Sequence, residues 1–598
     1  MNRLEERKFI IFGIFIVIAV IYLIRLFYIQ VIDDKYKLDA NNNVLRYNTE
    51  YPSRGLIYDR NGRLLVYNEA AYDLMVIPRQ AKDVDSIELC KFLGISPEVY
   101  SERLRQAKAY SKFKPSVFDK QFSPAAYAAI QEKMYKFPGF FFQKRTLRYY
   151  PRSTAAHMLG YVGEVDEKII SQNPYYKMGD YIGISGIEKS YEEVLRGKKG
   201  VKIVMVDVHN RIKGSFQNGL YDTAAVAGLN IFSSIDAELQ LYGEKLLQNK
   251  RGSIVAIEPS TGEILALISS PSYNPNLLVG RERAKNYNKL AKDTLKPLFN
   301  RATMASYPPG STFKMAIALI AQQEGVLTTD SRLPCSFSVG PKSVHCHPHP
   351  SPANITQSIQ YSCNPFYCRA FVNTIGKYKT AAEGYQVWKN HINSFGFGVK
   401  LNTDVANELK GFIPGVEYFD RYHGKGRWKA ASIYSLGIGQ GEVGVTPLQM
   451  ANYAAILANR GYYYIPHLVK GIENGEIDKR FKEKHYTTID TKYFTPVVEA
   501  MYQVVEAGTA RGGKIPGIPF CGKTGTAQNP HGKDHSIFIA FAPKDEPKIA
   551  IAVYVENAGF GATYAVPIAS LMIEKYLTDT IKRPDLEKRM IETNLLGN

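Results

Sequence analysis

YPPGSTFKM, residues 307–315, and the apolar run AIALIAQQEG that follows it (316–325) form the most informative stretch of the sequence. The two prolines and the glycine predict a turn, and the apolar run predicts a helix that begins at once. Ser311 would then lie at a helix N-terminus, where unpaired amide groups and the helix dipole favour a developing negative charge. Lys314 is three residues further on and shares a face with Ser311. An ordinary helix cap explains the pair equally well when the stretch is taken alone.

The spacing of Ser311 and Lys314 suits nucleophilic catalysis. A serine hydroxyl is a weak nucleophile until a base takes its proton, and a lysine that is desolvated in a cleft can become that base. Short patterns of this kind recur by chance, and Ser111-Lys112-Phe113-Lys114 also fits. Because Pro115 follows and no apolar helix does, we interpret this second copy as a solvated loop.

Two further motifs follow in the sequence. Ser362-Cys363-Asn364 ends a helical pattern and would bring a second hydroxyl and an amide toward the first serine. Lys523-Thr524-Gly525-Thr526 follows PFCG (519–522), and its glycines suit a strand edge that a substrate backbone must approach closely. A lysine and two hydroxyls at such an edge could hold a carboxylate. The alternative for the last motif is a turn with a solvated lysine.

The surrounding patterns predict an α/β sandwich. The stretch Gly252–Ser272 is typical of a β-hairpin, and HSIFIAFAP (535–543) and KIAIAVYVEN (548–557) read as late strands. Between them we expect helices over residues 311–325, 352–376, 446–460 and 493–507. Strands before and after a helical block favour one sheet with helices on its faces.

The N-terminus predicts a membrane anchor. Residues 9–24 carry no charge, and apolar character resumes after Arg25 as far as residue 31, which gives about 34 Å of helix. The basic residues Arg3, Arg7 and Lys8 precede it, so the tail 1–8 should remain in the cytoplasm and the rest should lie in the periplasm. We expect an uncleaved, single-pass anchor in the inner membrane. A core helix of a soluble protein is the alternative.

The size and charge of the chain limit the number of domains and the kinds of partner that we expect. The chain has 598 residues, of which 45% are hydrophobic and 22% charged, so two or more folded domains are expected. The net charge of +19 suits anionic partners such as membrane lipid or an acidic wall polymer. Because the cations are spread along the chain, we expect no nucleic acid partner. After the anchor we expect a β-rich pedestal over 32–228, with a polar connector, a hairpin at Asn61-Gly62 and helices within 84–135.

The order Ser-x-x-Lys, Ser-x-Asn, Lys-Thr-Gly resembles penicillin-recognising serine enzymes. The likeness to class B penicillin-binding proteins covers nearly the whole chain after the anchor. It is carried by RGLIYDRNG (54–62), GIEKSYEEVLRG (186–197), GIGQG (437–441) and TPLQM (446–450). The resemblance implies a pedestal or dimerisation-type domain over 32–228, a transpeptidase domain with an antiparallel sheet flanked by helices over 229–576, and a C-terminal tail over 577–598.

Family members are D,D-transpeptidases that cross-link the stem peptides of nascent peptidoglycan, and β-lactams acylate them. By this resemblance Ser311 attacks the peptide, Lys314 removes its proton, and Ser362 and Asn364 relay protons and position the substrate. The substrate carboxylate would be held by Lys523, Thr524 and Thr526 beside Gly525, and the amides of Ser311 and Thr526 would form the oxyanion hole. The resemblance also implies a SEDS-family glycosyltransferase as membrane partner.

Three rival hypotheses remain open at this stage. A membrane-bound β-lactamase or β-lactam sensor would use the same chemistry. A non-catalytic scaffold would keep the fold and only activate the glycosyltransferase. A division-type transpeptidase would act elsewhere in the cell, although the cysteine pattern favours the elongation type.

Cys335, Cys346 and Cys363 lie close in sequence to three histidines. Some elongation-type members are similar in holding a zinc ion between the first two motifs, with a cysteine inside the second motif as one ligand. This implies Cys363 as a ligand, completed by Cys335, Cys346 and His349 (or His347). The family's site uses carboxylates where Cys335 and Cys346 stand, so this chain departs from the pattern. A Cys335–Cys346 disulfide or free thiols are the alternatives, and we expect the other cysteines to be small buried residues: Cys90, Cys368 and Cys521.

Overall fold

The computed structural model describes residues 3–29, 45–82, 84–206 and 212–597. These residues form two compact units. The smaller unit comprises Met1–Arg54, Ala70–Thr146 and Arg196–Gly228, and the larger one comprises Gly55–Glu69, Leu147–Leu195 and Leu229–Asn598. Each unit is therefore assembled from segments that are far apart in sequence.

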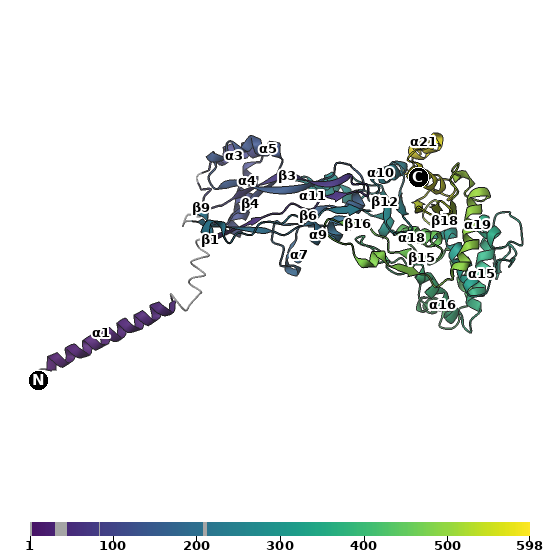
Figure 1. Ribbon diagram of the computed structural model, residues 1–598, viewed down its shortest axis with the longest axis horizontal. Helices are drawn as coiled ribbons and strands as arrows, with labels where there is room; N and C mark the ends of the chain where they lie inside the picture. Colours follow the sequence, from purple (N-terminus) through teal and green to yellow (C-terminus); the bar gives the residue numbers. More distant parts are fainter. Residues whose placement is uncertain (1–2, 30–44, 83, 207–211, 598) are drawn as a thin grey trace. The chain divides into compact units, whose positions relative to one another are not determined.

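Helix α1 (Arg3–Phe27) is long and apolar enough to cross a membrane. Its stretch Phe9–Phe27 has a mean hydropathy of 2.9, and none of it is buried inside the protein. The 19 residues span about 28 Å, close to the hydrocarbon thickness of a bilayer. Within the described ranges this is the one helix of that kind (Figure 1). The predicted connector runs over residues 32–50, and its residues 32–44 lie outside the described residues.

The smaller unit combines short strands with three amphipathic helices. Its first sheet has the antiparallel order β1-β8-β9, made of β1 (Leu45–Glu50), β8 (Gly200–Val206) and β9 (Ile212–Ser215). A core of Leu74, Leu89, Phe118 and Phe137 is enclosed by the other elements. These are β3 (Leu64–Val76), β4 (Ser116–Phe122), β5 (Phe140–Tyr149), α3 (Ser86–Leu93), α4 (Pro97–Tyr110) and α5 (Pro124–Gln131). The helices fall within the predicted stretch 84–135.

An antiparallel five-stranded sheet is the centre of the larger unit. Its order is β12-β11-β20-β19-β18, which leaves β18 at one edge. The strands are β11 (Gly252–Ile257), β12 (Ile264–Ser270), β18 (Cys521–Ala527), β19 (His535–Ala542) and β20 (Ile549–Val555). Almost every residue of these strands is buried because both faces of the sheet are covered, which explains the largely apolar sequences of β11, β12, β19 and β20. The predicted hairpin and the two late strands are therefore present.

Helices cover both faces of this sheet, as the sequence predicted (Figure 1). On one side α10 (Ala237–Leu247) packs on β12, and α20 (Ala565–Thr578) packs on β19 and β20. On the other side α18 (Pro447–Ala458), almost entirely buried, packs on β11, β19 and β20. A helical layer next to α18 contains α12 (Arg301–Met304), α13 (Lys314–Gln323), α14 (Ile355–Gln360), α15 (Asn364–Gly376), α16 (Ala381–Ser394), α17 (Val416–His423) and α19 (Phe494–Ala507).

Early segments of the chain complete the larger unit. Strand β2 (Ile57–Tyr58) pairs with β10 (Ile231–Ser233), which also pairs with β16 (Val469–Ile472). Further short elements are α6 (Ala156–Leu159), β6 (Val162–Glu164), α7 (Glu167–Gln172), β7 (Tyr181–Gly183), α8 (Gly186–Ser190), α9 (Glu192–Leu195), α11 (Arg283–Lys292), β13 (Ser338–Val339), β14 (Lys342–Ser343), β15 (Tyr462–Tyr464) and β17 (Lys484–Tyr486).

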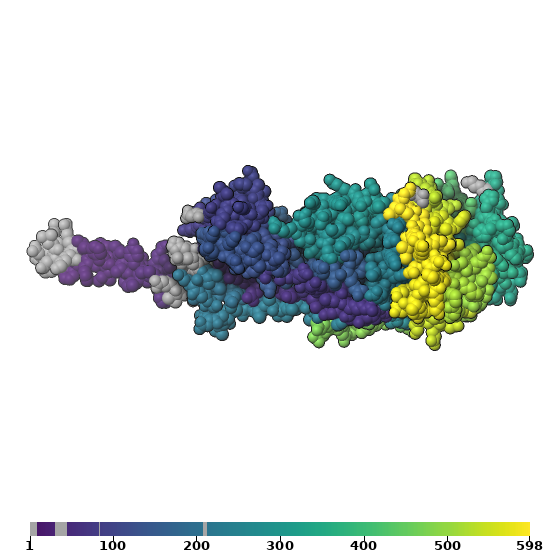
Figure 2. Space-filling model, turned by 90° about the horizontal axis from the view of Figure 1, so that it is seen from above, coloured from purple at the N-terminus to yellow at the C-terminus, as the bar shows by residue number. Residues whose placement is uncertain are grey.

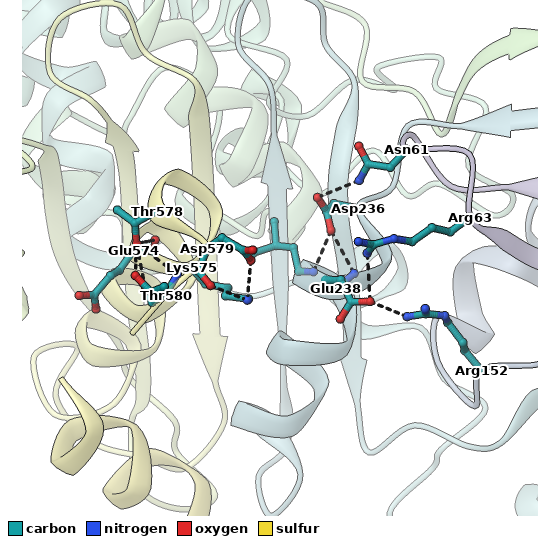
Figure 3. A network of polar contacts seen from close by, with 11 residues as sticks. Asn61, Arg63, Arg152, Asp236, Glu238, Glu574, Lys575, Thr578, Asp579 and Thr580 are labelled. Atoms are coloured by element: carbon teal, nitrogen blue, oxygen red, sulfur yellow. Dashed lines mark hydrogen bonds and ion pairs between the residues drawn. The ribbon is translucent and has the colours of Figure 1, made fainter. Parts of the chain in front are cut away.

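Polar contacts attach these early segments to the start of α10 (Figure 3). Asp236 caps α10 by accepting hydrogen bonds from the amides of Glu238 and Leu239. Glu238 in turn forms ion pairs with Arg63 at 3.0 Å and Arg152 at 2.7 Å. The start of α10 is thus fixed by residues from before position 153.

The C-terminal residues pack on the larger unit. Residues 577–598, which we expected to be a tail, contain helix α21 (Pro584–Glu592), and its Met590 is buried. The fully buried Lys250 donates hydrogen bonds to the carbonyls of Met590 and Thr593. The yellow segment in Figure 2 accordingly lies along the surface of this unit.

Candidate active site

Ser311 lies in a tight turn that leads directly into a buried helix. Residues Gly310–Phe313 form the 3-10 turn η5, and α13 continues from Lys314. The predicted helix therefore begins with a 3-10 turn. Gly310 has a φ of +58°, and a Cβ atom there would lie 2.6 Å from the carbonyl oxygen of Thr526. Glycine is needed for this approach, which places the Ser311 turn against the edge strand β18.

Lys314 is fully buried and points at the second motif. Its Nζ donates to the backbone carbonyl of Ser362 at 2.6 Å, the Ser362 Oγ at 3.1 Å and the Asn364 Oδ1 at 2.7 Å. All three acceptors are neutral, so no carboxylate offsets the cost of burying the charge. Burial lowers the pKa of Lys314 to about 8. In roughly a tenth of the molecules the Lys314 amine is then neutral at pH 7 and able to accept a proton.

Ser362 is positioned by a break between two helices. We predicted one helix over 352–376, and this was wrong: α14 ends at Gln360 and α15 begins at Asn364. Ser362 lies in the break with a φ of +56°, a conformation that no helix interior contains. Pro365 then occupies the first turn of α15, where its missing N–H costs nothing. The break turns the Ser362 hydroxyl and the Asn364 amide toward Lys314.

Lys523 approaches the same hydroxyl from β18. It is fully buried, and its Nζ donates to the Ser362 Oγ at 2.9 Å and to the Thr524 carbonyl at 3.0 Å. Burial, and to a lesser extent the charge of Lys314, hold the pKa of Lys523 well below its usual range. The Ser362 hydroxyl therefore lies between two lysines, and the structure brings together four of the predicted residues.

The rest of the third motif forms the edge of the sheet beside the Ser311 turn. A Cβ atom on Gly525 would lie 2.9 Å from the Thr312 side chain, so the two segments are in close contact. The Thr524 hydroxyl shares a 2.7 Å hydrogen bond with the Thr509 hydroxyl. Thr526 is only partly buried. A free strand edge with hydroxyls and a nearby lysine suits an extended peptide that ends in a carboxylate.

Sequence reasoning missed two polar residues that support this edge. Gln440 donates from Nε2 to the Thr526 carbonyl at 2.9 Å, and the neighbouring Gly439 carbonyl accepts from the Gly310 amide at 2.8 Å. Residues 437–441 therefore hold both the Ser311 turn and the end of β18. The signal was present in the sequence as one polar residue within GIGQG. Thr509, the partner of Thr524, lies in a stretch that carried no such signal.

The second Ser-x-x-Lys copy is a loop, as predicted. Ser111 ends α4, and its hydroxyl accepts hydrogen bonds from the amides of Phe113 and Lys114. It belongs to the smaller unit, whereas Ser362–Asn364 and Lys523–Thr526 belong to the larger one.

The predicted metal ligands lie together in the structure. One ligand atom from each of four residues lies within 4.8 Å of the others: Cys335, Cys346, His349 and Cys363. The Cys363 and Cys335 sulfurs are 3.5 Å apart, and the Cys346 sulfur lies 3.6 Å from His349 Nε2. Ligands of a tetrahedral zinc ion are separated by about 3.8 Å, and thiolates with one imidazole are a usual donor set. The residues therefore fit zinc.

The other predicted uses of the cysteines find less support. All six cysteines are free in the structure, which does not show the Cys335–Cys346 disulfide. His347 donates from Nε2 to the Tyr361 carbonyl at 3.0 Å instead of joining the cluster. Cys90, Cys368 and Cys521 are buried, as predicted.

Two family models match the sequence. The family described as "Penicillin binding protein transpeptidase domain" matches residues 252–574, more than half of the chain. The chain belongs to this family. A second family, "Penicillin-binding Protein dimerisation domain", matches residues 49–231.

Relatives of this penicillin-binding transpeptidase match over nearly their full length. Peptidoglycan D,D-transpeptidase MrdA of Acinetobacter baumannii is 31% identical to this chain. The alignment covers 97% of this chain and 88% of the MrdA sequence. Among solved structures, a complex between PBP2 and MreC from Helicobacter pylori has a TM-score of 0.74 at 25% identity, covering 89% of this chain and 99% of that one. A structure titled "Structural coordination of polymerization and crosslinking by a peptidoglycan synthase complex" has a TM-score of 0.68 at 26% identity, covering 96% and 99%.

These findings confirm the predicted fold and reaction class. The penicillin-binding transpeptidase fold carries an N-terminal dimerisation-type domain and one apolar N-terminal helix. The family consists of serine-type acyltransferases, and the relatives with printed activities are D,D-transpeptidases, in agreement with the three motifs.

Proposed function

We propose that the protein is an elongation-type peptidoglycan D,D-transpeptidase that works through an acyl-enzyme on Ser311. The observation that carries this is the Lys314 amine, which is buried, lowered in pKa to about 8, and hydrogen-bonded to both Ser362 and Asn364. A buried amine that is partly neutral near pH 7 is a base in position to activate the serine of its own helical turn.

In the first half-reaction the Ser311 oxygen attacks the carbonyl carbon between two terminal D-alanines, and Lys314 takes the hydroxyl proton. The amides of Ser311 and Thr526 stabilise the oxyanion. When the tetrahedral intermediate collapses, the C–N bond breaks and the leaving D-alanine amine receives a proton through Ser362, which contacts both lysines. Lys523, Thr524 and Thr526, beside Gly525, would hold the terminal carboxylate, and Asn364 the peptide.

In the second half-reaction the amine of a neighbouring stem peptide attacks the ester carbonyl. The amine loses a proton to the same base, the C–O bond to Ser311 breaks, and the serine regains its proton. The product is an amide cross-link. A β-lactam would acylate Ser311 by the same first step with no leaving amine to depart, so its adduct should persist.

Mass spectrometry of the purified protein after exposure to benzylpenicillin tests this proposal. We expect one adduct on the wild type and on Ser111→Ala, and none on Ser311→Ala. Rapid turnover of the drug would instead support a β-lactamase or sensor. The absence of an adduct from all three proteins, together with normal cell shape when Ser311→Ala replaces the wild type, would favour a non-catalytic scaffold. If the wild-type protein restores cell division rather than cell shape to cells that lack it, the division type is favoured.

We also propose that Cys335, Cys346, His349 and Cys363 hold one structural zinc ion. When bound, zinc would cross-link the 335–349 segment to the Ser362–Asn364 break and so steady the position of the Ser362 hydroxyl. Support comes from the donor set and its separation of at most 4.8 Å.

Metal analysis of the protein tests the zinc proposal. We expect about one zinc per chain in the wild type and in Cys90→Ser, whose cysteine lies in the smaller unit. Cys346→Ser should lose most of the zinc and unfold at a lower temperature. A wild type without zinc whose mass is two daltons low would show a disulfide instead.

Location and partners follow from the same assignment. We propose that α1 anchors the protein in the inner membrane with its N-terminus in the cytoplasm and the rest in the periplasm, as the basic residues before the span favour. Relatives solved with MreC or within a synthase complex support a role in elongation and cell shape beside a SEDS-family glycosyltransferase. The substrate is nascent peptidoglycan, and we propose no nucleic acid partner. Protease protection of an N-terminal tag in intact spheroplasts tests the orientation.

A further inference from the structure

An exposed group of aromatic side chains lies on the larger unit around α17. The exposed fraction is 47% for Phe412 and 69% for Tyr422, and Tyr418 between them is partly exposed. Their rings are in contact: the centroids of Phe412 and Tyr418 are 5.8 Å apart, and those of Tyr418 and Tyr422 are 4.7 Å apart. We call these three residues the aromatic platform.

The aromatic platform is held rigidly from beneath. Phe419, on the buried face of α17, packs against Tyr385 and Trp428, with ring centroids 5.1 Å and 5.5 Å away. The Trp428 indole donates to Asp420 on α17 at 2.8 Å. The exposed rings therefore have a fixed support, and ordering them on binding costs little side-chain entropy.

The platform is connected to the Ser311 turn through backbone pairing. Phe412 and Gly444 exchange two hydrogen bonds, at 2.6 Å and 2.9 Å. The next residue, Val445, pairs in the same way with Tyr307 at 2.9 Å and 3.0 Å. Tyr307 is four residues before Ser311, so the chain and strand spacings put Phe412 at most about 30 Å from the serine.

Exposed basic residues lie close in sequence to the aromatic platform. Four exposed basic residues form no ion pair with any residue in the described part of the chain: Lys410, Arg421, Lys425 and Arg427. Two exposed acids lie in the same region, Glu417 and Glu442, so the four cations outnumber them. Rigid aromatic faces together with free cations suit a ligand that offers both apolar ring faces and carboxylates.

We propose that the aromatic platform binds the peptidoglycan strand whose stem peptides react at Ser311. The apolar faces of the sugar rings would stack on Phe412, Tyr418 and Tyr422, and the carboxylates of the peptides would meet the four cations. This proposal rests on the proposed function, because that function makes an anionic sugar–peptide polymer the substrate. The platform adds a second contact outside the reacting peptide, which raises the local concentration of strands at the serine.

Co-sedimentation of the full-length, detergent-solubilised protein with purified peptidoglycan sacculi tests the proposal. We expect the double variant Phe412→Ala/Tyr422→Ala to bind about tenfold more weakly than the wild type, which corresponds to the loss of two stacked rings. Tyr135→Ala, which removes a tyrosine that is 81% exposed in the smaller unit, is the matched control and should bind as the wild type does.

Two further measurements separate the possible outcomes. Titration of each sample with benzylpenicillin gives the concentration of folded active sites, so binding is compared per active site and a misfolded variant is recognised. Failure of the wild type to be acylated would refute the proposed function itself. Normal acylation together with equal binding by the wild type and the double variant would overturn the platform.

The chemical basis of binding is resolved with altered polymer. Sacculi whose peptide carboxylates have been converted to amides should keep the difference between the wild type and the double variant but lose the effect of Lys425→Ala/Arg427→Ala. Soluble glycan strands without peptides should compete with the sacculi for the wild type; if they do not compete, the rings do not bind sugar and the platform proposal is wrong.

Discussion

At the scale of single residues, two buried lysines share one hydroxyl. Lys314 and Lys523 both donate to the Ser362 Oγ, and each raises the cost of charging the other. A substrate carboxylate arriving at the β18 edge would favour the charged form of Lys523. The added charge would then push Lys314 further toward its neutral form. Binding of the correct substrate would in this way prepare the base that the serine needs.

The pH dependence of acylation tests Lys314 as that base. Burial lowers its pKa to about 8, and the neutral amine is the active form. The rate of acylation by a fluorescent penicillin should therefore rise nearly tenfold per pH unit below 8 and level off above it. Lys314→Arg, which stays protonated throughout, should remove both the rise and most of the rate. A wild-type rate that stays flat from pH 6 to 9, with the fold intact, would contradict this role.

At the scale of elements, the site exists because a turn, a helix break and a strand edge meet. Gly310 allows the Ser311 turn to contact the backbone of Thr526, and Gln440 fixes the same Thr526 carbonyl from the other side. The oxyanion hole that we propose would use the amide of this residue. Its geometry therefore depends on contacts that are made by backbone atoms and one glutamine.

Gly310→Ala should disrupt this meeting point. The new methyl group would lie 2.6 Å from a backbone oxygen, so the turn or β18 must move. We expect acylation to fall at least about a hundredfold, the scale of losing an oxyanion donor. Gly325→Ala is the matched control: its φ of +68° is equally left-handed, but nothing lies within 4 Å. It should cost about 1 kcal/mol of stability and leave the acylation rate unchanged. Equal rates for both variants would rule out this steric role.

Gln440→Glu should slow acylation without weakening the initial binding of the drug. The change keeps the shape but removes the donor to the Thr526 carbonyl and sets a negative charge against it. Loss of this hydrogen bond, worth about 1–3 kcal/mol, predicts an acylation rate constant that is about tenfold to hundredfold lower. Stopped-flow measurements over a range of drug concentrations separate this constant from the dissociation constant. Gln386→Glu, at an exposed glutamine of α16, is the control. A change confined to the dissociation constant would argue against a positioning role.

The sequence predicted some of these elements better than others. Local signals were enough for the Ser311 turn, the 252–272 hairpin and the two late strands, because prolines, glycines and alternating apolar runs act within a few residues. The break at Ser362 was not predicted, since a serine rarely adopts a positive φ and its contacts with Lys314 and Lys523 come from distant parts of the sequence. Gln440 was quoted as part of GIGQG, but its partner is 86 residues away. Such long-range pairs leave no local pattern.

At the scale of the whole molecule, the larger unit is not one continuous stretch of sequence. Residues 55–69 and 147–195 belong to it, although they precede the 229 boundary that the sequence suggested. Arg60 pairs with Glu258 at 2.6 Å, and Asp59 accepts hydrogen bonds from the amides of Asn61 and Arg63. The RGLIYDRNG motif is therefore part of the support of the catalytic sheet.

A chain that begins at residue 229 should consequently fold poorly. It would lack β2, the partner of β10, and apolar side chains that share the main core: Ile57, Leu65, Val66, Ile187 and Leu195. At about 2 kcal/mol each, their loss approaches the whole stability of a typical domain. We expect residues 229–598 to be insoluble or to melt at least about 10 °C below residues 45–598, both produced without the anchor. Thermal unfolding and benzylpenicillin acylation of the two chains check this. Equal melting temperatures and equal acylation would mean that the catalytic fold is complete without its early segments, and that the ion pairs of Glu238 with Arg63 and Arg152 (Figure 3) add nothing measurable to its stability.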